Sequence, residues 1–184
     1  DKSRPVAADL EELRTVWTPI VARVEEGGGR IAIENSTMIF SHDEWPGGHN
    51  IATTPRMWRR ILEQWEGTIG LNFDPSHLVW QLIDSERAIS EFGDRIYHVH
   101  AKDLEIRRDG LYEHGVMSAG IGWQVPRLPG LGEVRWDRFF AALHGVGYDG
   151  PVIIEHEDRA FEGSDAAVIR GFQLARDILA PYVV

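Results

Sequence analysis

The sequence contains no cysteine, so disulfides, thiolate metal ligands and a thiol nucleophile are excluded. It also lacks any apolar run near the roughly 20 residues of a membrane-spanning helix, and no signal peptide is visible. Basic residues are scarce, because 19 Lys and Arg face 29 Asp and Glu for a net charge of −10. A nucleic-acid surface would need a basic face. We therefore expect a cytoplasmic protein with neither a nucleic-acid partner nor a membrane partner.

Two familiar functional motifs are missing as well. There is no GxSxG segment of the kind that presents a nucleophilic serine in hydrolases. The glycines within residues 127–132 have no lysine after them and do not open a helix directly after a strand. They therefore do not predict a nucleotide-binding loop.

The composition that is present is ordinary for a globular protein, with 43% hydrophobic and 26% charged residues. A chain of 184 residues can enclose a sizeable core. We expect residues 1–184 to form a single domain.

Short apolar segments alternate with helical patterns along the chain. The apolar segments end at residues 34, 74, 100 and 155, and their apolar character predicts strands that are buried on both faces. Helical periodicity covers residues 9–26, 54–65, 76–92, 136–144 and 164–179. This alternation predicts an α/β fold with βαβ units and a parallel sheet. Four strands fit either an open sheet or half of an eight-stranded barrel.

Several local signals refine these elements. Pro19 predicts a kink or a break in the first helix. Thr54 followed by Pro55 predicts a helix start, and Ser164 predicts the cap of the last helix. Residues 101–132 form a long predicted loop, in which Asp109 and Gly110 indicate a small hairpin.

Each predicted strand ends in a side chain that can bind a metal: Glu34, Asp74, His100 and Glu155. Burying an unpartnered carboxylate costs several kcal/mol, and a shared divalent cation would offset that cost. Three carboxylates and one imidazole favour Mn²⁺, Mg²⁺ or Co²⁺, with Zn²⁺ or Fe²⁺ as alternatives. Each residue alone could be an exposed strand end, but four equivalent positions make a common metal site the leading interpretation.

Further polar residues lie next to these strand ends. His77 follows Asp74 by one helical turn, so it can bind a substrate oxygen or support a ligand, or simply pack. His98 shares a strand face with His100 and can line the cavity. Lys102 can stabilise an enolate or an alkoxide, or form a solvated pair with Asp103.

Two predicted loops offer groups for a sugar-like substrate. Trp45 lies in a loop rich in glycine and polar residues, where its ring can stack on a sugar or anchor the loop. Arg127 can hold a phosphate, a carboxylate or a hydroxyl group, or form a surface ion pair.

Five segments carry a resemblance to a known family: Ile33–Asn35, Asn72–Leu78, His98–Asp103, Leu128–Gly132 and Ile154–Asp158. Together they resemble the sugar phosphate isomerase/epimerase group of the xylose isomerase-like (β/α)₈ TIM barrel superfamily. The resemblance runs from about residue 9 to the end. Its motifs indicate the superfamily in combination and the substrate only poorly.

The resemblance implies a TIM barrel of which this chain supplies about the last four βα units, strands five to eight. It implies that Glu34, Asp74, His100 and Glu155 match the four metal ligands of that family. It also implies that Glu34 and Glu155 match the acid/base pair of the epimerases, and that His77 matches a histidine that contacts substrate.

These observations predict a metal-dependent isomerase or epimerase of a sugar or sugar phosphate. One glutamate would remove the proton next to a metal-bound carbonyl, and the other would return a proton to the resulting enediolate. A lyase or dehydratase acting on a keto-sugar or keto-inositol is the main alternative, with Lys102, His77 or His98 protonating the leaving oxygen. A nuclease related to apurinic endonucleases and a non-catalytic half-barrel are further alternatives.

The expected partners follow from the length of the chain. Half a barrel exposes two sheet edges and an apolar lumen, so we expect the missing N-terminal half-barrel or another polypeptide to complete it. We also expect a homo-oligomer and a small carbohydrate substrate.

Overall fold

The computed structural model describes residues 4–37, 41, 43, 50–117, 119 and 121–183. Four parallel strands form its main sheet, in the order β1-β2-β3-β6. These strands are β1 (Ile31–Glu34), β2 (Ile69–Phe73), β3 (Ile96–Ala101) and β6 (Val152–Ile154). The predicted parallel sheet of four strands is therefore confirmed.

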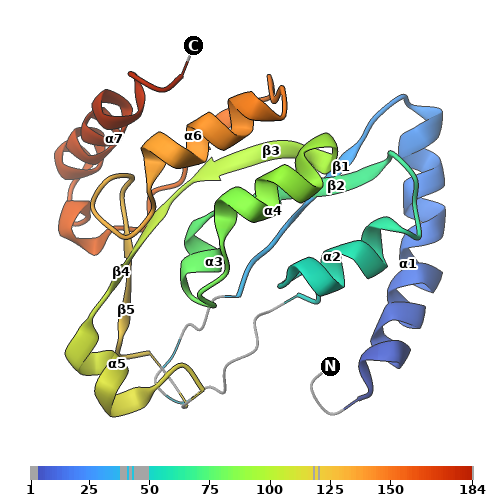
Figure 1. Ribbon diagram of the computed structural model, residues 1–184, viewed down its shortest axis with the longest axis horizontal. Coiled ribbons are helices and arrows are strands. Elements are labelled where there is room, and N and C mark those ends of the chain that lie inside the picture. The colour runs from blue at the N-terminus through green and yellow to red at the C-terminus, as the bar shows by residue number, and fades with distance from the viewer. Residues whose placement is uncertain are drawn as a thin grey trace.

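Helices connect the strands and cover one face of the sheet (Figure 1). The larger helices are α1 (Val6–Glu26), α2 (Pro55–Leu62), α4 (Ser85–Phe92), α6 (Trp136–Gly145) and α7 (Asp165–Leu179). The short helices are α3 (Ser76–Val79), α5 (Arg108–His114), η1 (Gly93–Arg95) and η2 (Arg159–Phe161). None of the helices in the described part of the chain has the length and apolar character needed to cross a bilayer.

The predicted helix starts are confirmed at their caps. The Thr54 side chain accepts a hydrogen bond from the backbone N–H of Met57 at 3.4 Å. Ser164 accepts one from Ala167 at 3.2 Å, which opens α7. Each bond satisfies one of the N–H groups that a helix leaves unpaired in its first turn.

Of the two outcomes predicted for Pro19, the break does not occur, since α1 runs unbroken from Val6 to Glu26 with Pro19 inside it; the kink stays a prediction. A second local prediction is wrong. Asp109 and Gly110 do not form a hairpin turn but lie in α5. A Cβ atom at Gly110 would collide with the backbone of Gly122, so this glycine serves a close approach of two segments.

The region predicted as a loop after His100 contains ordered structure instead. Strands β4 (Asp103–Ile106) and β5 (Gln124–Arg127) pair in an antiparallel ribbon. This ribbon has its own small apolar cluster, in which Trp80 and Trp123 meet edge to face with ring centroids 5.7 Å apart. The paired residues of β4 and β5 lie more than 15 positions apart in the chain, so the local sequence pattern does not indicate this ribbon.

The main core lies between the sheet and its covering helices. Trp58 of α2 is fully buried, and its ring meets Phe73 of β2 at 6.0 Å and Phe92 of α4 at 5.2 Å. Its indole N–H donates to the carbonyl of Ala52 at 2.6 Å. Phe73 also faces Phe139 of α6, so this aromatic group joins three helices to one strand.

We expect replacement of Trp58 with alanine to lower the free energy of unfolding by about 3–5 kcal/mol. The change opens a cavity and leaves the Ala52 carbonyl without its hydrogen bond. Urea denaturation of the full-length protein measures this change. Tyr112 is exposed to solvent, so Tyr112→Ala is a control for which we expect little change in the free energy of unfolding. A loss below about 1 kcal/mol for Trp58→Ala would contradict this account of the core.

The register of the sheet shifts by one residue between β2 and β3. Leu71 pairs with Ile96, but the next residue, Asn72, pairs with His98, so Tyr97 is passed over. The glycine at position 70 leaves room there, since a Cβ atom would collide with the Tyr97 ring.

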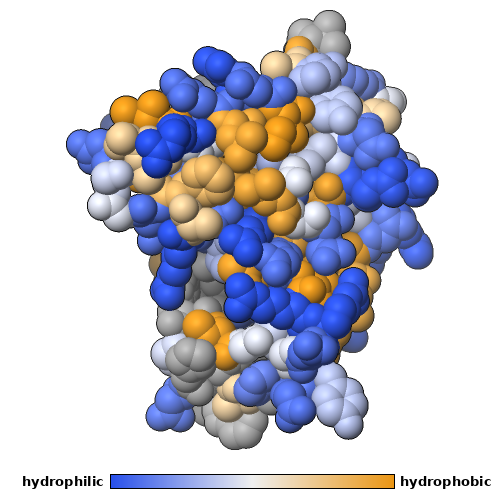
Figure 2. Space-filling view, turned by 90° about the vertical axis from the view of Figure 1, so that its left-hand side faces the viewer, coloured by the Kyte–Doolittle hydropathy of each residue, from blue (hydrophilic) through white to orange (hydrophobic). Residues whose placement is uncertain are grey.

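Both edges of the main sheet are open among the described residues, because β1 pairs with β2 alone and β6 with β3 alone. Ile153 of β6 is 49% exposed, which is unusual for an isoleucine in a strand. Figure 2 shows apolar surface on the side of the molecule that carries α7, and α7 itself contributes exposed Ile169 and Phe172.

Candidate metal centre and active site

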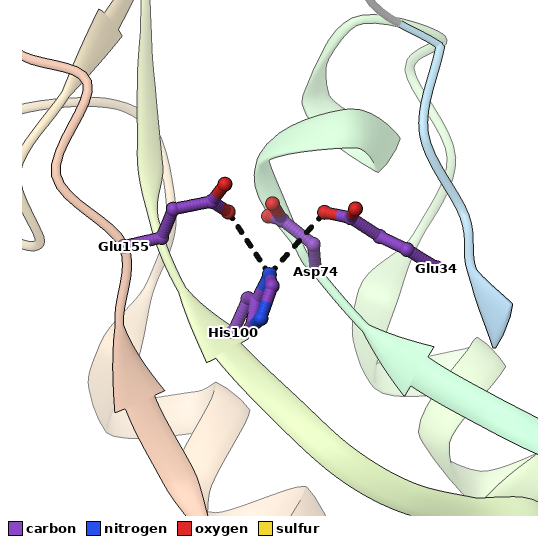
Figure 3. Close-up of side chains that lie close together, drawn as sticks. All are labelled: Glu34, Asp74, His100 and Glu155. Atoms are coloured by element: carbon purple, nitrogen blue, oxygen red, sulfur yellow. Dashed lines mark hydrogen bonds and ion pairs between the residues drawn. The ribbon is translucent and has the colours of Figure 1, made fainter. Parts of the chain in front are cut away.

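The carboxyl ends of the four parallel strands converge on one cluster of side chains (Figure 3). Glu34 is the last residue of β1, Asp74 directly follows β2, His100 lies near the end of β3, and Glu155 directly follows β6. Each residue offers one ligating atom, and these four atoms all lie within 4.8 Å of one another. In α/β folds with parallel strands, sites form at this edge of the sheet.

The imidazole of His100 lies between the two glutamates. Its Nδ1 atom is 3.3 Å from Glu34 Oε1 and 3.0 Å from Glu155 Oε2. All three side chains are partly exposed, whereas Asp74 behind them is fully buried. Solvent therefore reaches the cluster through these three side chains.

Asp74 is held by its neighbours on two sides. Asn35 donates its amide to the carbonyl of Asp74 and accepts from its N–H, at 2.9 and 2.8 Å. Asp74 Oδ1 accepts from the N–H of Ser76 at 2.8 Å. The other oxygen, Oδ2, points into the cluster, where it is buried and accepts no hydrogen bond among the described residues.

The charges of the cluster stabilise one another. Burial alone would raise the pKa of Glu34, but hydrogen bonds from His100 and His77 hold it well below its usual range. The same reasoning applies to Glu155, whose pKa is lowered by His100 and Lys102 against the effect of burial. Hydrogen bonds to both glutamates raise the pKa of His100 to about 10. At neutral pH a cation that binds Nδ1 must therefore displace a proton.

A sequence profile of the xylose isomerase-like TIM barrel family matches residues 1–178 of this chain. The match covers far more than half of the sequence and includes all four strand ends of the cluster. The chain belongs to the xylose isomerase-like TIM barrel family. The prediction of a TIM barrel with about four βα units present is thus confirmed.

Relatives within this family include proteins of known name. The chain is 34% identical over 152 residues to the uncharacterized protein YfiH of Bacillus subtilis, covering 77% of this chain and 45% of YfiH. It is 29% identical over 161 residues to the inosose dehydratase of Geobacillus thermodenitrificans, covering 86% of this chain and 51% of that enzyme. The chain thus spans about half the length of these curated relatives.

A solved structure supports the fold. The D-psicose 3-epimerase of Clostridium cellulolyticum, determined with D-tagatose, superimposes with a TM-score of 0.65 at 16% identity. The match covers 100% of this chain and 60% of that enzyme. At this level of identity the likeness shows the TIM barrel fold alone.

The donor set suits a divalent metal ion of the kind that a barrel enzyme can use. Three carboxylates and one imidazole supply oxygen and nitrogen ligands for a hard or borderline cation. Two of the carboxylate oxygens, Asp74 Oδ2 and Glu155 Oε2, are buried, and the groups beside them are the ammonium of Lys102 and imidazole nitrogens. The three carboxylates outnumber the single ammonium beside them, and a divalent ion would balance the remaining negative charge. The four residues therefore fit a metal ion and form a group that can hold one.

His77 lies beside this group in the barrel. Its side chain is 1% exposed, and its Nε2 atom is 3.5 Å from Glu34 Oε1 and 3.4 Å from Asp74 Oδ2. The backbone N–H of Thr37 donates to Nδ1 at 3.5 Å. This bond leaves Nε2 to carry the proton toward the carboxylates.

Lys102 is more buried than the sequence indicates. The prediction left a solvated pair with Asp103 open, but the Lys102 side chain is 2% exposed and its Nζ contacts Glu155 and Asp74. Asp103 faces elsewhere and accepts hydrogen bonds from the N–H groups of Gly130 and Val134. Lys102 therefore belongs to the cluster, and Asp103 fixes the loop after β5.

His98 joins the cluster through a residue that sequence reasoning missed. The amide of Asn72 contacts His98 Nδ1 at 2.9 Å on one side and His100 Nε2 at 3.1 Å on the other. The two rings meet edge to face with centroids 5.3 Å apart. Asn72 lies two residues before Asp74, and alternate residues of a strand face the same side, so this spacing could have predicted Asn72 beside the cluster.

The described part of the structure does not place the two predicted substrate residues Arg127 and Trp45 in the cluster. Arg127 of β5 pairs with Glu105 and with Asp158, the latter at 3.2 Å, which is the ion-pair alternative left open above. Trp45 lies outside the described residues. Their roles in substrate binding stay predictions.

Proposed function

We propose that this protein is a metal-dependent isomerase or epimerase of a sugar or sugar phosphate. Glu34, Asp74, His100 and Glu155 would hold one divalent ion, with Mn²⁺ the expected species and Mg²⁺, Co²⁺ or Zn²⁺ the alternatives. The observation that carries the proposal is the placement of two glutamates, Glu34 and Glu155, on either side of one atom, His100 Nδ1, at 3.3 and 3.0 Å. Two bases that face one site are what a proton transfer between two faces of a carbon requires.

When bound, the ion would act as a Lewis acid that acidifies the C–H next to a substrate carbonyl. The carboxylate of Glu34, which is ionised at neutral pH, would accept that proton. Glu155 in its protonated form would deliver its proton to the opposite face of the same carbon, which gives an epimer and leaves Glu34 protonated and Glu155 ionised. Delivery to the neighbouring carbon instead gives an aldose–ketose isomer.

The surrounding residues would orient the substrate and its charge. We propose that His77, which already faces Glu34 and Asp74, contacts a substrate hydroxyl. His98 would line the same cavity, and Lys102 would stabilise negative charge on the enediolate oxygen. Arg127 and Trp45 remain candidates for the outer part of the substrate.

A dehydratase is the second candidate, because the curated relatives include inosose dehydratases at 26–29% identity. Here a glutamate removes the proton next to the carbonyl of a keto-inositol or keto-sugar. The neighbouring C–OH bond breaks, and the hydroxyl leaves as water with a proton from Lys102, His77 or His98. Lys102 Nζ is 3.0 Å from Glu155, which places an acid beside a base.

Solvent hydrogen exchange tests the shared first step. We expect the Mn²⁺-loaded full-length protein to incorporate deuterium from D₂O next to the carbonyl of its substrate, measured by NMR across a panel of keto-sugars and inosose. Product mass separates the two candidates, because dehydration loses one water and epimerisation loses nothing. Turnover without any exchange would rule out the enediolate route for both.

The proposal extends to partners. We propose that four further βα units lie against the open edges of β1 and β6 and complete the barrel, since the curated relatives are about twice as long as this chain. A homo-oligomer and a cytoplasmic location remain predictions. A nuclease is disfavoured by the net charge of −10.

A further inference from the structure

The ammonium of Lys102 is surrounded by carboxylates that serve different purposes. Its Nζ atom is 3.0 Å from Glu155 Oε2, 3.2 Å from Asp74 Oδ2 and 3.2 Å from Glu157 Oε2. Glu155 and Asp74 belong to the four residues proposed to hold the metal ion. Glu157 is not among the side chains whose ligating atoms lie within 4.8 Å of one another.

This arrangement poses an electrostatic conflict. A buried lysine needs negative charge nearby, because burial disfavours the ammonium form. The carboxylate oxygens that Lys102 contacts, Asp74 Oδ2 and Glu155 Oε2, are buried and face the cluster. An ammonium drawn toward these two oxygens competes with a metal ion for them, and like charges in a poorly solvated site repel strongly.

Glu157 supplies the charge that resolves this conflict. Its Oε2 atom is buried and has no hydrogen-bond partner among the described residues, yet it lies within ion-pair distance of Lys102. Its carboxylate therefore balances the ammonium from a position outside the metal group.

We propose that Glu157 is a positioning residue that acts as a counter-ion of Lys102 and thereby offsets the ammonium charge with which the divalent ion would compete for Asp74 and Glu155. The inference rests on the proposed metal site. It assigns to Glu157 no contact with metal or substrate, so its effect must pass through Lys102.

A double-mutant cycle on metal affinity tests this dependence. Mn²⁺ binding to the metal-free full-length protein is measured by electron paramagnetic resonance. We expect Glu157→Gln to weaken binding roughly tenfold, the lower end for partners that support metal ligands. In a Lys102→Met background the same substitution should change affinity less than about threefold, because the ammonium that Glu157 offsets is gone.

Two further variants keep the test sharp. Glu91→Gln, at an exposed carboxylate paired with Arg59 on the surface, is the matched control and should leave Mn²⁺ affinity unchanged. Lys102→Gln replaces Lys102→Met if the latter does not fold, as judged by circular dichroism.

The outcomes separate the inference from the proposed function. If the wild-type protein shows no saturable Mn²⁺ binding, the metal site itself is wrong. If the wild-type binds Mn²⁺ but Glu157→Gln binds equally well, only the inference fails. It also fails if Glu157→Gln weakens binding to the same degree with and without Lys102, because Glu157 would then act directly or through the fold.

Discussion

Replacement of Glu34 or of Glu155 with glutamine is expected to lower kcat by about 10²–10⁴-fold, the usual contribution of a positioned general acid or base. The change keeps the size of each side chain and removes the group that accepts or returns the proton. If the two glutamates serve opposite faces of one carbon, each variant should retain solvent deuterium exchange with one epimer and lose it with the other. NMR of each purified epimer in D₂O measures this split.

The same variants must be checked for metal content, since each glutamate is also a proposed ligand. Deuterium exchange should be compared at saturating Mn²⁺, so that weaker metal binding is not mistaken for a loss of proton transfer. Glu63→Gln, at an exposed glutamate that follows α2, is the control and should behave as wild type. Equal exchange of both epimers in Glu34→Gln and Glu155→Gln would refute the two-base assignment.

Replacement of Asp74 with asparagine is expected to weaken Mn²⁺ binding by more than the roughly 100-fold upper range of residues that merely support ligands. Asp74 is fully buried and held by Asn35 and Ser76. Asparagine can keep the hydrogen bond from the N–H of Ser76, while the charge that faces the cluster is lost. Isothermal titration calorimetry with the metal-free protein measures the change.

Asp84→Asn provides the comparison for Asp74→Asn. Asp84 Oδ1 accepts a hydrogen bond from the N–H of Arg87 and caps α4, so its amide variant removes a charge without touching the cluster. Its Mn²⁺ affinity should equal that of the wild type. Unchanged affinity in Asp74→Asn would show that Asp74 is structural and that the proposed coordination is wrong.

The four-residue cluster could be predicted because strand ends are visible in sequence. Apolar runs fixed where β1, β2, β3 and β6 end, and parallel strands bring their carboxyl ends to one edge of the sheet. His77 followed from helical spacing after Asp74. These are short-range regularities, so one sequence was sufficient to place them.

The remaining features depend on contacts between distant segments. The β4–β5 ribbon pairs residues on either side of α5. Gly110 packs closely against the backbone of Gly122, a contact that the local turn pattern of Asp109 and Gly110 does not indicate. Arg127 pairs with Glu105 across the ribbon, and the sequence alone did not favour this ion pair over a contact with substrate. The Lys102–Glu157 contact joins segments 55 residues apart in the chain, and no local pattern announces it.

The residue skipped in the pairing of β2 with β3 decides which way two imidazoles point. Side chains along a strand alternate in direction, so one passed-over residue, Tyr97, reverses the alternation for all that follows. Under uninterrupted pairing His98 would stand opposite Phe73, on the side packed by α2 and α6. His100 would turn with it into an apolar layer. Gly70 makes room for this irregularity, because a Cβ atom there would collide with the Tyr97 ring and the Arg95 carbonyl.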